Sequence, residues 1–208
     1  MTVEIALYDP LRKYTLDGTV DLDTDVLKLA LLDSGYSPQP AAAAWVAATS
    51  YALGTIIVVG GMFYEALVAG VSSGSQPVFP TTRGATLTEN TMAWYCWGYS
   101  PPSAHAIFAD VSAHEIVASG YTAGGAALTG SAVTVSGRSA TFSADPVSWA
   151  AILCTARYAV LYKVGTANGV VNPLIAYLLL DSLNIDVVVP VAALFTIEWT
   201  ADGIFTTQ

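Results

Sequence analysis

The feature that most limits how this chain can fold is a repeated pattern of short apolar or alternating segments between turn-forming residues. The segments are rich in Val, Ile, Thr, Tyr and Trp, and Gly, Pro, Asn and Asp separate them. β-Branched and aromatic residues fit the pleated surface of a sheet, whereas glycine and proline interrupt regular structure. Apolar residues at helical spacing extend over no more than two or three turns. The pattern therefore predicts an all-β chain.

Individual strands can be predicted from this pattern. Residues 26–32 form an apolar segment after an acidic turn. Residues 174–180 form a nearly continuous apolar run, which is typical of a strand buried on both faces. Residues 151–164 alternate, which predicts one long strand with every second side chain from Ile152 to Tyr162 on the same face.

Three hairpins are also predicted. One joins residues 132–135 to residues 139–142 around Ser136-Gly137-Arg138. Gly60-Gly61 separates residues 55–59 from residues 62–68, and glycine tolerates the positive φ that tight hairpin turns need. Residues 195–199 and 203–207 are predicted to form a last hairpin near the end of the chain.

Proline-rich segments set off one aromatic-rich block of the chain. Residues 37–40 precede this block and residues 99–102 follow it, which indicates a small inserted β module at 41–98. The host domain is then made of residues 1–40 and 99–208, and we predict a β-sandwich for it, with a jelly-roll-like topology as one form. An insertion at a loop is tolerated because it disturbs no core hydrogen bonds.

Charged side chains are unusually scarce. They make up 11% of the 208 residues, against roughly 25% in an ordinary soluble protein. Hydrophobic residues make up 54%. Either small and hydroxyl side chains cover much of the surface, or partner proteins cover part of it, and we expect both to apply.

Several partners are not expected. The net charge of −9 and seven scattered Lys and Arg residues argue against direct contact with nucleic acid, which needs clustered cations. No apolar run approaches the roughly 20 residues of a membrane-spanning helix. The first residues carry acid early and lack the basic and apolar parts of a signal peptide. We therefore expect a soluble protein that is made in a cytoplasm.

No catalytic or cofactor-binding motif is found. His105 and His114 lack metal-ligand spacing, and Cys96 and Cys154 are expected to be buried free thiols. The acids of segment 17–25 resemble a calcium loop but lack its Asp-x-Asp-x-Asp-Gly order, so we interpret the segment as a sheet edge, with weak calcium binding as the alternative. The chain is therefore expected not to be an enzyme, and to need no cofactor and no metal.

The inserted block is the one region whose side chains suggest recognition. Aromatic residues crowd into it, among them Trp45, Tyr51, Phe63, Tyr64, Trp94, Tyr95 and Trp97. Most are expected to form the core of so small a module, but exposed rings can stack on sugars or anchor protein contacts. Five are the candidates for contact with a glycan or a protein: Trp45, Tyr51, Tyr64, Trp94 and Trp97.

The host-domain sequence resembles a family of tailed-phage virion proteins. The motifs that carry the resemblance include Leu7-Tyr-Asp-Pro-Leu-Arg-Lys-Tyr14, Ser119-Gly-Tyr-Thr-Ala-Gly-Gly-Ala-Ala-Leu128, Ala156-Arg-Tyr-Ala-Val-Leu-Tyr-Lys163 and Phe195-Thr-Ile-Glu-Trp199. Members are described as phage structural proteins, and some are similar to capsid decoration (cement) or head-fibre proteins. The resemblance implies binding to the major capsid protein on the outer surface of the head. A homotrimer would fit three-fold positions of the shell, but no feature of the sequence encodes that number.

The inserted block is similar to the chitin-binding-type carbohydrate modules of phage tail and fibre proteins. The matching pattern is Trp45 … Thr49-x-Tyr51 … Gly61-x-x-Tyr64 … Trp94 … Gly98, with Asn90-Thr91 where an Asp-Gly turn is usual. The function expected from both resemblances is capsid decoration that stabilises the expanded head. The alternative is a tail or fibre protein that recognises a host-surface glycan, and a small hydrolase ranks last because catalytic residues are lacking.

Overall fold

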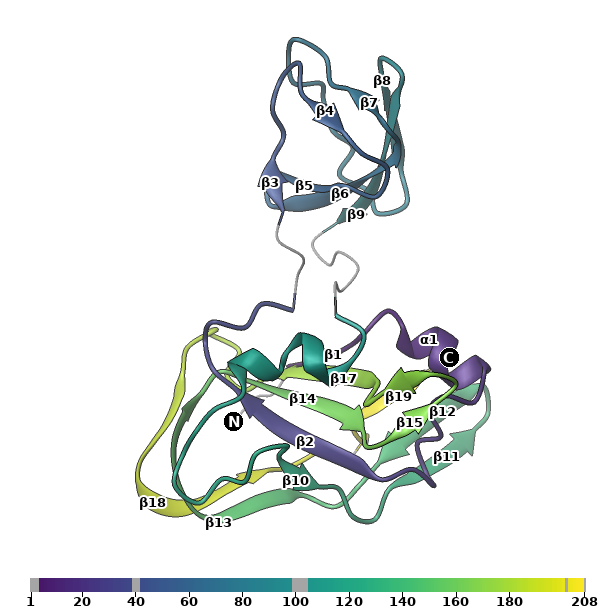
Figure 1. The fold of residues 1–208 in the computed structure, drawn as a ribbon. Coiled ribbons are helices and arrows are strands. Elements are labelled where there is room, and N and C mark those ends of the chain that lie inside the picture. The colour runs from purple at the N-terminus through teal and green to yellow at the C-terminus, as the bar shows by residue number, and fades with distance from the viewer. Residues whose placement is uncertain (1–3, 39–41, 99–104, 201, 208) are drawn as a thin grey trace. The chain divides into compact units, whose positions relative to one another are not determined.

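The computed structural model is nearly all β. Strands hold 49% of the chain and helices 6%, which confirms the all-β, sandwich-like fold class. The structure describes residues 4–38, 42–98, 105–200 and 202–207. Contacts divide the chain into two compact units: a host unit, Met1–Ser37 with His105–Gln208, and a module, Pro38–Ala104 (Figure 1). The predicted boundary residues 40, 41 and 99 lie outside the described residues.

The centre of the host unit is a five-stranded antiparallel sheet in the order β1-β17-β14-β2-β10. Its strands are β1 (Glu4–Leu7), β17 (Leu174–Leu179), β14 (Tyr158–Lys163), β2 (Leu27–Leu32) and β10 (Ala126–Ala127). The strands predicted at 26–32 and 174–180 are therefore confirmed as β2 and β17.

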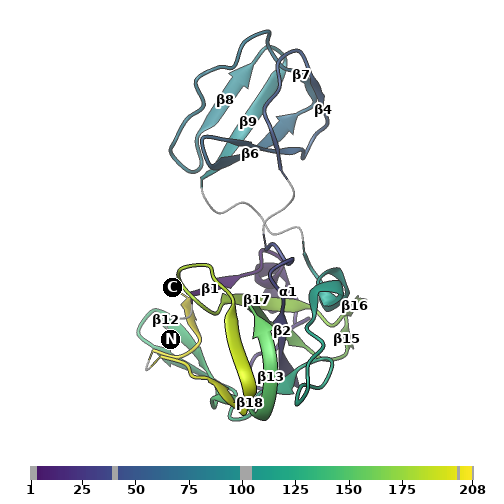
Figure 2. The same ribbon diagram turned by 90° about the vertical axis from the view of Figure 1, so that its left-hand side faces the viewer.

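A second layer packs on one face of this sheet. It contains β11 (Ala132–Ser136), β12 (Ser139–Ser143), β13 (Val147–Ala156), β18 (Val187–Ile197) and β19 (Phe205–Thr207). Strands β13 and β18 pair with each other, as Figure 2 shows, while β11, β12 and β19 form a separate sheet. Leu29 and Leu161 of the first layer share one buried cluster with Trp149, Ile152 and Ile197 of the second. This interior is that of a sandwich, and the jelly-roll form stays a prediction.

The opposite face of the five-stranded sheet is also covered. Two short 3₁₀ helices, η1 (Phe108–Asp110) and η2 (Ser112–His114), lie over it. Phe108 stacks on Tyr162 with ring centroids 4.2 Å apart, and Val111 is completely buried in the same cluster as Val160. Because both faces are covered, the central strands carry apolar residues at nearly every position.

The acidic segment 17–25 is not the predicted sheet edge. It follows helix α1 (Leu11–Leu16), and its residues form turns rather than a strand. Hydrogen bonds within the chain hold the acids: Thr19 donates to Asp17, and Lys163 Nζ lies 2.8 Å from an Asp25 oxygen. Local side-chain bonds of this kind compete with strand pairing. Among the described residues no group of three or more metal-ligating side chains occurs.

The prediction of one strand over 151–164 is wrong. The chain leaves β13 after Ala156 and enters β14 at Tyr158, in the other layer. At the crossing, Arg157 N–H donates to Leu32 O (3.0 Å), and Arg157 Nε donates to Asp186 (2.9 Å). The crossing changes which alternate residues face the core between the layers, so the face predicted for the second half of the segment is also wrong.

The predicted last hairpin is also wrong. β18 pairs with β13, and β19 pairs with β12 instead of β18. Within the described residues, the only β-bridge between the two segments is the isolated one from Thr200 to Gly203, and Ala201 lies outside those residues. Core packing explains why β19 pairs with β12, because Phe205 contacts the buried ring of Phe142 with ring centroids 5.5 Å apart.

The module contains a five-stranded sheet in the order β3-β5-β6-β9-β8 and a separate pair, β4 with β7. Its strands are β3 (Ala43–Ala44), β4 (Ser50–Tyr51), β5 (Ile56–Val59), β6 (Met62–Val68), β7 (Gly70–Val71), β8 (Thr86–Glu89) and β9 (Met92–Gly98). The hairpin predicted at Gly60-Gly61 is confirmed, with φ of 58° and 80°. No helix in the described ranges has the length and hydropathy needed to span a membrane.

Candidate interaction surfaces

Three of the five aromatic candidates lie in the module core. Tyr51, Tyr64 and Trp94 are 7%, 2% and 0% exposed. Tyr51 packs edge-on against Trp94 with ring centroids 5.2 Å apart, and Phe79 packs against Tyr64. Burial leaves these rings no surface on which a sugar could stack or a partner could rest. The correction follows from module size, because so small a core uses aromatic rings where a larger domain uses aliphatic side chains.

Trp45 is held to the same core through a buried carboxylate. Its Nε1 donates to Glu89 Oε2 (3.3 Å), and Trp94 Nε1 donates to the same oxygen (2.8 Å). Ser73 donates to Glu89 Oε1 from both its backbone N–H (2.7 Å) and its hydroxyl (2.6 Å). Sequence reasoning missed Glu89 because it is a single acid beside a turn.

These hydrogen bonds decide the charge of Glu89. Burial acts to raise the pKa of its carboxyl group, but the bonds from Ser73 and the two indoles outweigh burial, and that pKa lies below its ordinary value. The turn after it differs from the usual Asp-Gly pair, and Asn90 supplies the positive φ, 51°. Trp45, Trp94 and Glu89 thus serve the structure of the module.

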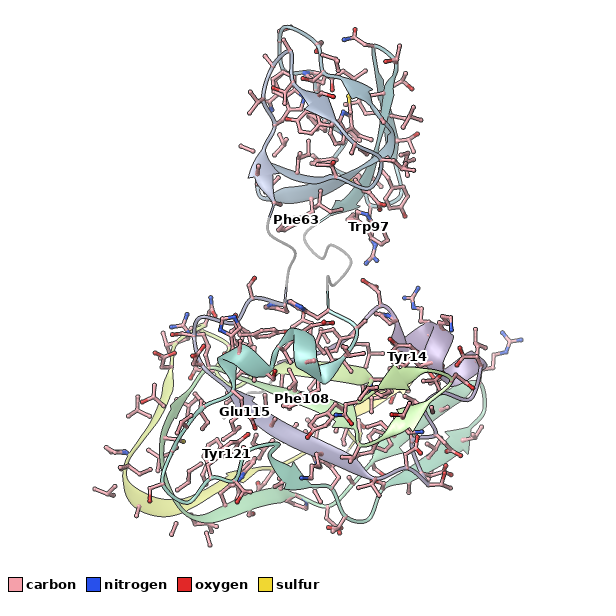
Figure 3. The ribbon with its side chains drawn as sticks, viewed as in Figure 1. Tyr14, Phe63, Trp97, Phe108, Glu115 and Tyr121 are labelled. Atoms are coloured by element: carbon pink, nitrogen blue, oxygen red, sulfur yellow. The ribbon has the colours of Figure 1, made fainter. Side chains whose placement is uncertain are left out.

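Trp97 lies on the opposite face of the module sheet. Side chains of β9 alternate between the two faces, so Trp97 and Tyr95 point away from the core, as Phe63 of β6 does (Figure 3). We call Phe63, Tyr95 and Trp97 the outer aromatic cluster. All three are partly exposed. Phe63 and Tyr95 were among the aromatic residues of the block, but strand alternation alone does not tell which face becomes the core.

The contacts of Trp97 limit what it can bind. Its Nε1 donates to Glu65 (2.9 Å), Arg83 lies 5.6 Å from its ring centroid, and Tyr95 packs edge-on at 5.0 Å. Stacking on a sugar requires a bare ring face, and Arg83 lies over one face of this ring. Trp, Tyr and Arg together are the residues enriched at the centres of protein–protein contacts. The outer aromatic cluster therefore suits a protein contact better than a glycan.

The host unit has a different surface, which we call the ribbon face: the outward side of β13 and β18. The 10 residues of β13 and the 11 of β18 include no charged side chain. Leu153, Val188, Val191 and Leu194 are 44%, 57%, 67% and 67% exposed. Grouped exposed apolar residues of this kind mark interaction sites more often than scattered ones do.

A shallow hollow of about 590 Å³ lies at one end of the ribbon face. Leu153 and Val188 line it together with Val117, which is fully exposed. Glu115 also lines it, but its carboxylate already accepts hydrogen bonds from Tyr121 OH (2.7 Å) and Gly124 N–H (2.6 Å) (Figure 3). Asp33 lines it too, and its Oδ1 accepts a hydrogen bond from Gly35 N–H (2.8 Å), so the hollow combines exposed apolar side chains with two acids that already have hydrogen-bond partners.

The remaining sequence candidates have structural surroundings. Cys96 and Cys154 are buried free thiols, as predicted. Burial raises the pKa of the Cys154 thiol, which lowers its reactivity as a thiolate. His114 Nδ1 lies 3.4 Å from an Asp33 oxygen on the surface, next to η2.

No family model, no curated protein and no solved structure matches this chain. The function of the chain is therefore inferred from its own surfaces.

Proposed function

We propose that the chain is a structural, non-enzymatic protein of a tailed-phage particle that decorates the head and binds the major capsid protein. The ribbon face is the observation that carries this proposal. It combines exposed aliphatic side chains with a complete lack of charge over two long strands. A free protein gains nothing from such a surface, whereas a protein that is covered on assembly gains hydrophobic stabilisation.

The physical task of a decoration protein suits this surface. Specific protein interfaces bury on the order of 1,600 Å² in total, and apolar burial contributes about 25 cal/mol per Å² before the costs of association. Many copies around a shell add avidity to modest single contacts. Self-association as a trimer would supply part of that avidity.

The test is to add the purified chain to expanded heads that lack it. We expect saturable binding at many copies per head and a higher temperature of DNA release. Leu194→Asp places a charge on the ribbon face and should abolish binding. Val135→Asp is the matched control, because Val135 is similarly exposed (74% against 67%) but lies on β11. Equal binding by both variants would contradict the proposal.

A second candidate function rests on the outer aromatic cluster of the module. There the chain would be a tail or fibre protein that contacts the host surface through Trp97, Tyr95 and Phe63. Their partial exposure favours this second function. The position of Arg83 above the Trp97 ring favours a protein receptor rather than a glycan. Trp97→Ala would then reduce adsorption to host cells, and particles would carry few copies of the chain. If particles carry many copies and the variant adsorbs normally, this second function is wrong.

A further inference from the structure

A second hollow in the host unit is more enclosed than the one at the ribbon face. It holds about 560 Å³ and lies between helix α1, the end of β1 and the sheet of β11, β12 and β19. Figure 1 shows α1 next to β12 and β19. Small-molecule sites commonly have volumes of about 300–1,000 Å³ and mainly apolar walls. We call this hollow the α1 pocket.

The α1 pocket has an apolar interior. Leu11 and Phe142, which line it, are 4% and 1% exposed, so they belong to the packed core of the host unit. Val133 and Leu7, also lining residues, are each 37% exposed. The sheet contributes three apolar side chains to the pocket. Val133, Phe142 and Phe205 are paired across β11, β12 and β19, so they lie on one face of that sheet.

The polar groups of the α1 pocket include one cation. Arg12 lines the pocket from α1 and has no ion pair among the described residues. Its neighbour Lys13 differs, because Lys13 pairs with Asp17 one turn further along. Arg12 is itself exposed to solvent, which places this cation at the rim of the α1 pocket rather than in its apolar interior. Thr207, at the edge strand β19, adds a hydroxyl to the lining.

We propose that the α1 pocket binds a small amphipathic monocarboxylate, with the chemistry of a medium-chain fatty acid. The apolar body lies against Leu11 and Phe142, and the carboxylate pairs with Arg12. A guanidinium matches a carboxylate with two parallel hydrogen bonds, and a charge-assisted bond is roughly twice as strong as a neutral one. A single cation in a chain of net charge −9 suits a monoanion and not a polyanion.

Sodium decanoate is the probe, with decanamide as its uncharged counterpart of equal length. We expect saturable decanoate binding by isothermal titration calorimetry, with a Kd below about 1 mM, and at least about ten-fold weaker binding of decanamide. Amide shifts of Leu7, Thr15 and Thr206 in the ¹H–¹⁵N spectrum should follow the same binding curve, because all three line the pocket.

Variants then locate the carboxylate. Arg12→Gln should weaken decanoate binding about ten-fold and leave decanamide binding unchanged. Lys13→Gln is the matched control, because it removes the adjacent cation outside the pocket lining, and it should bind like the wild type. Ala140→Leu, which fills the pocket, should abolish binding of both probes. If this last variant does not fold, the comparison of Arg12 with Lys13 still decides the result.

Three outcomes would overturn the proposal. The first is no decanoate binding at about 1 mM. The second is equal weakening by Arg12→Gln and Lys13→Gln, which would mean a general charge effect. The third is binding of a short peptide with an apolar last residue, dependent on Arg12, by a protein that ignores decanoate. That result would make the occupant a partner's chain end. None of these outcomes bears on the ribbon face.

Discussion

The module and the host unit have cores made of different kinds of side chain, and their exposed surfaces differ in the same way. The module core contains Tyr51, Tyr64, Phe79 and Trp94, whereas aliphatic side chains dominate the larger cluster of the host unit. Aromatic rings bring polar N–H and O–H groups that must find partners, and Glu89 supplies one such partner.

This difference indicates which surface of each unit is available for binding a partner. Most aromatic residues of the module lie in its core, and three lie on its outer side, where Glu65 and Arg83 contact Trp97. The host unit fills its core with Leu, Ile and Val and still exposes more of them on β13 and β18. One unit thus offers a small aromatic surface and the other a broad aliphatic one. Five substitutions can break or sharpen this comparison.

Trp94→Ala should have the largest effect. Removing a completely buried indole leaves a cavity and should cost the module about 3–5 kcal/mol of unfolding free energy. The host unit has its own core, so its unfolding should not change. Urea unfolding followed by ¹H–¹⁵N spectra resolves the two units. A single shared transition that moves as a whole would contradict separate cores.

Glu89→Gln should have the next largest effect, about 1–3 kcal/mol, because buried donors lose a charged acceptor. The folded-state pKa of Glu89 is lowered, so its stabilisation is fully present above the unfolded-state value of about 4.3. It is lost as the pH falls through the lower folded-state pKa. The variant should flatten this acid limb of module stability in urea unfolding from pH 7 to pH 2.

Glu65→Gln is the matched control for that experiment. Glu65 also accepts an indole N–H, from Trp97, but it lies on the outer side of the same sheet. Hydrogen bonds near solvent contribute less, so this variant should change stability by less than about 1 kcal/mol. Equal losses in the two variants would mean that the two faces of the module are not distinct.

Trp97→Ala should be milder than Trp94→Ala. The Trp97 ring is partly exposed and contacts Tyr95 and Arg83 rather than the core, so a loss of about 1 kcal/mol is expected. Thermal unfolding of the two variants side by side measures the difference. Equal losses would place Trp97 in the core and remove the outer aromatic cluster as a binding surface.

Leu194→Asp should have the smallest effect on stability, within about 0.5 kcal/mol, because the side chain is mostly exposed. The charge should instead lower self-association or partner binding. Sedimentation velocity at several concentrations measures the first. A loss of several kcal/mol would show that Leu194 belongs to the interior, and the ribbon face would then be part of the core.

Features set by neighbouring residues could be predicted from the sequence. The Gly60-Gly61 turn and the apolar strand β17 are such features, because a positive φ and burial on both faces each leave a local pattern. The break at Arg157 left none, since the alternation continues through it and only the second layer shows that the chain crosses. The pairing of β19 with β12 likewise depends on packing between residues far apart in sequence.

The candidate site was predicted in part for the same reason. Alternation along β9 separates Trp94 from Trp97, but the sequence does not say which set faces inward. No sequence motif marks the ribbon face, because an unbroken run of aliphatic and small residues is equally typical of a buried strand. No sequence pattern indicates the α1 pocket either, and only the fold places Arg12 at it.

The central claim is that the ribbon face is covered in the assembled particle, and thiol labelling tests it directly. Leu194→Cys is introduced into the chain, whose two native cysteines are buried. A maleimide should modify this thiol rapidly in the free protein and far more slowly in particles. Val135→Cys, on β11, is the control and should react at similar rates in the free protein and in particles. Equal labelling of Leu194→Cys in the free protein and in particles would contradict the account.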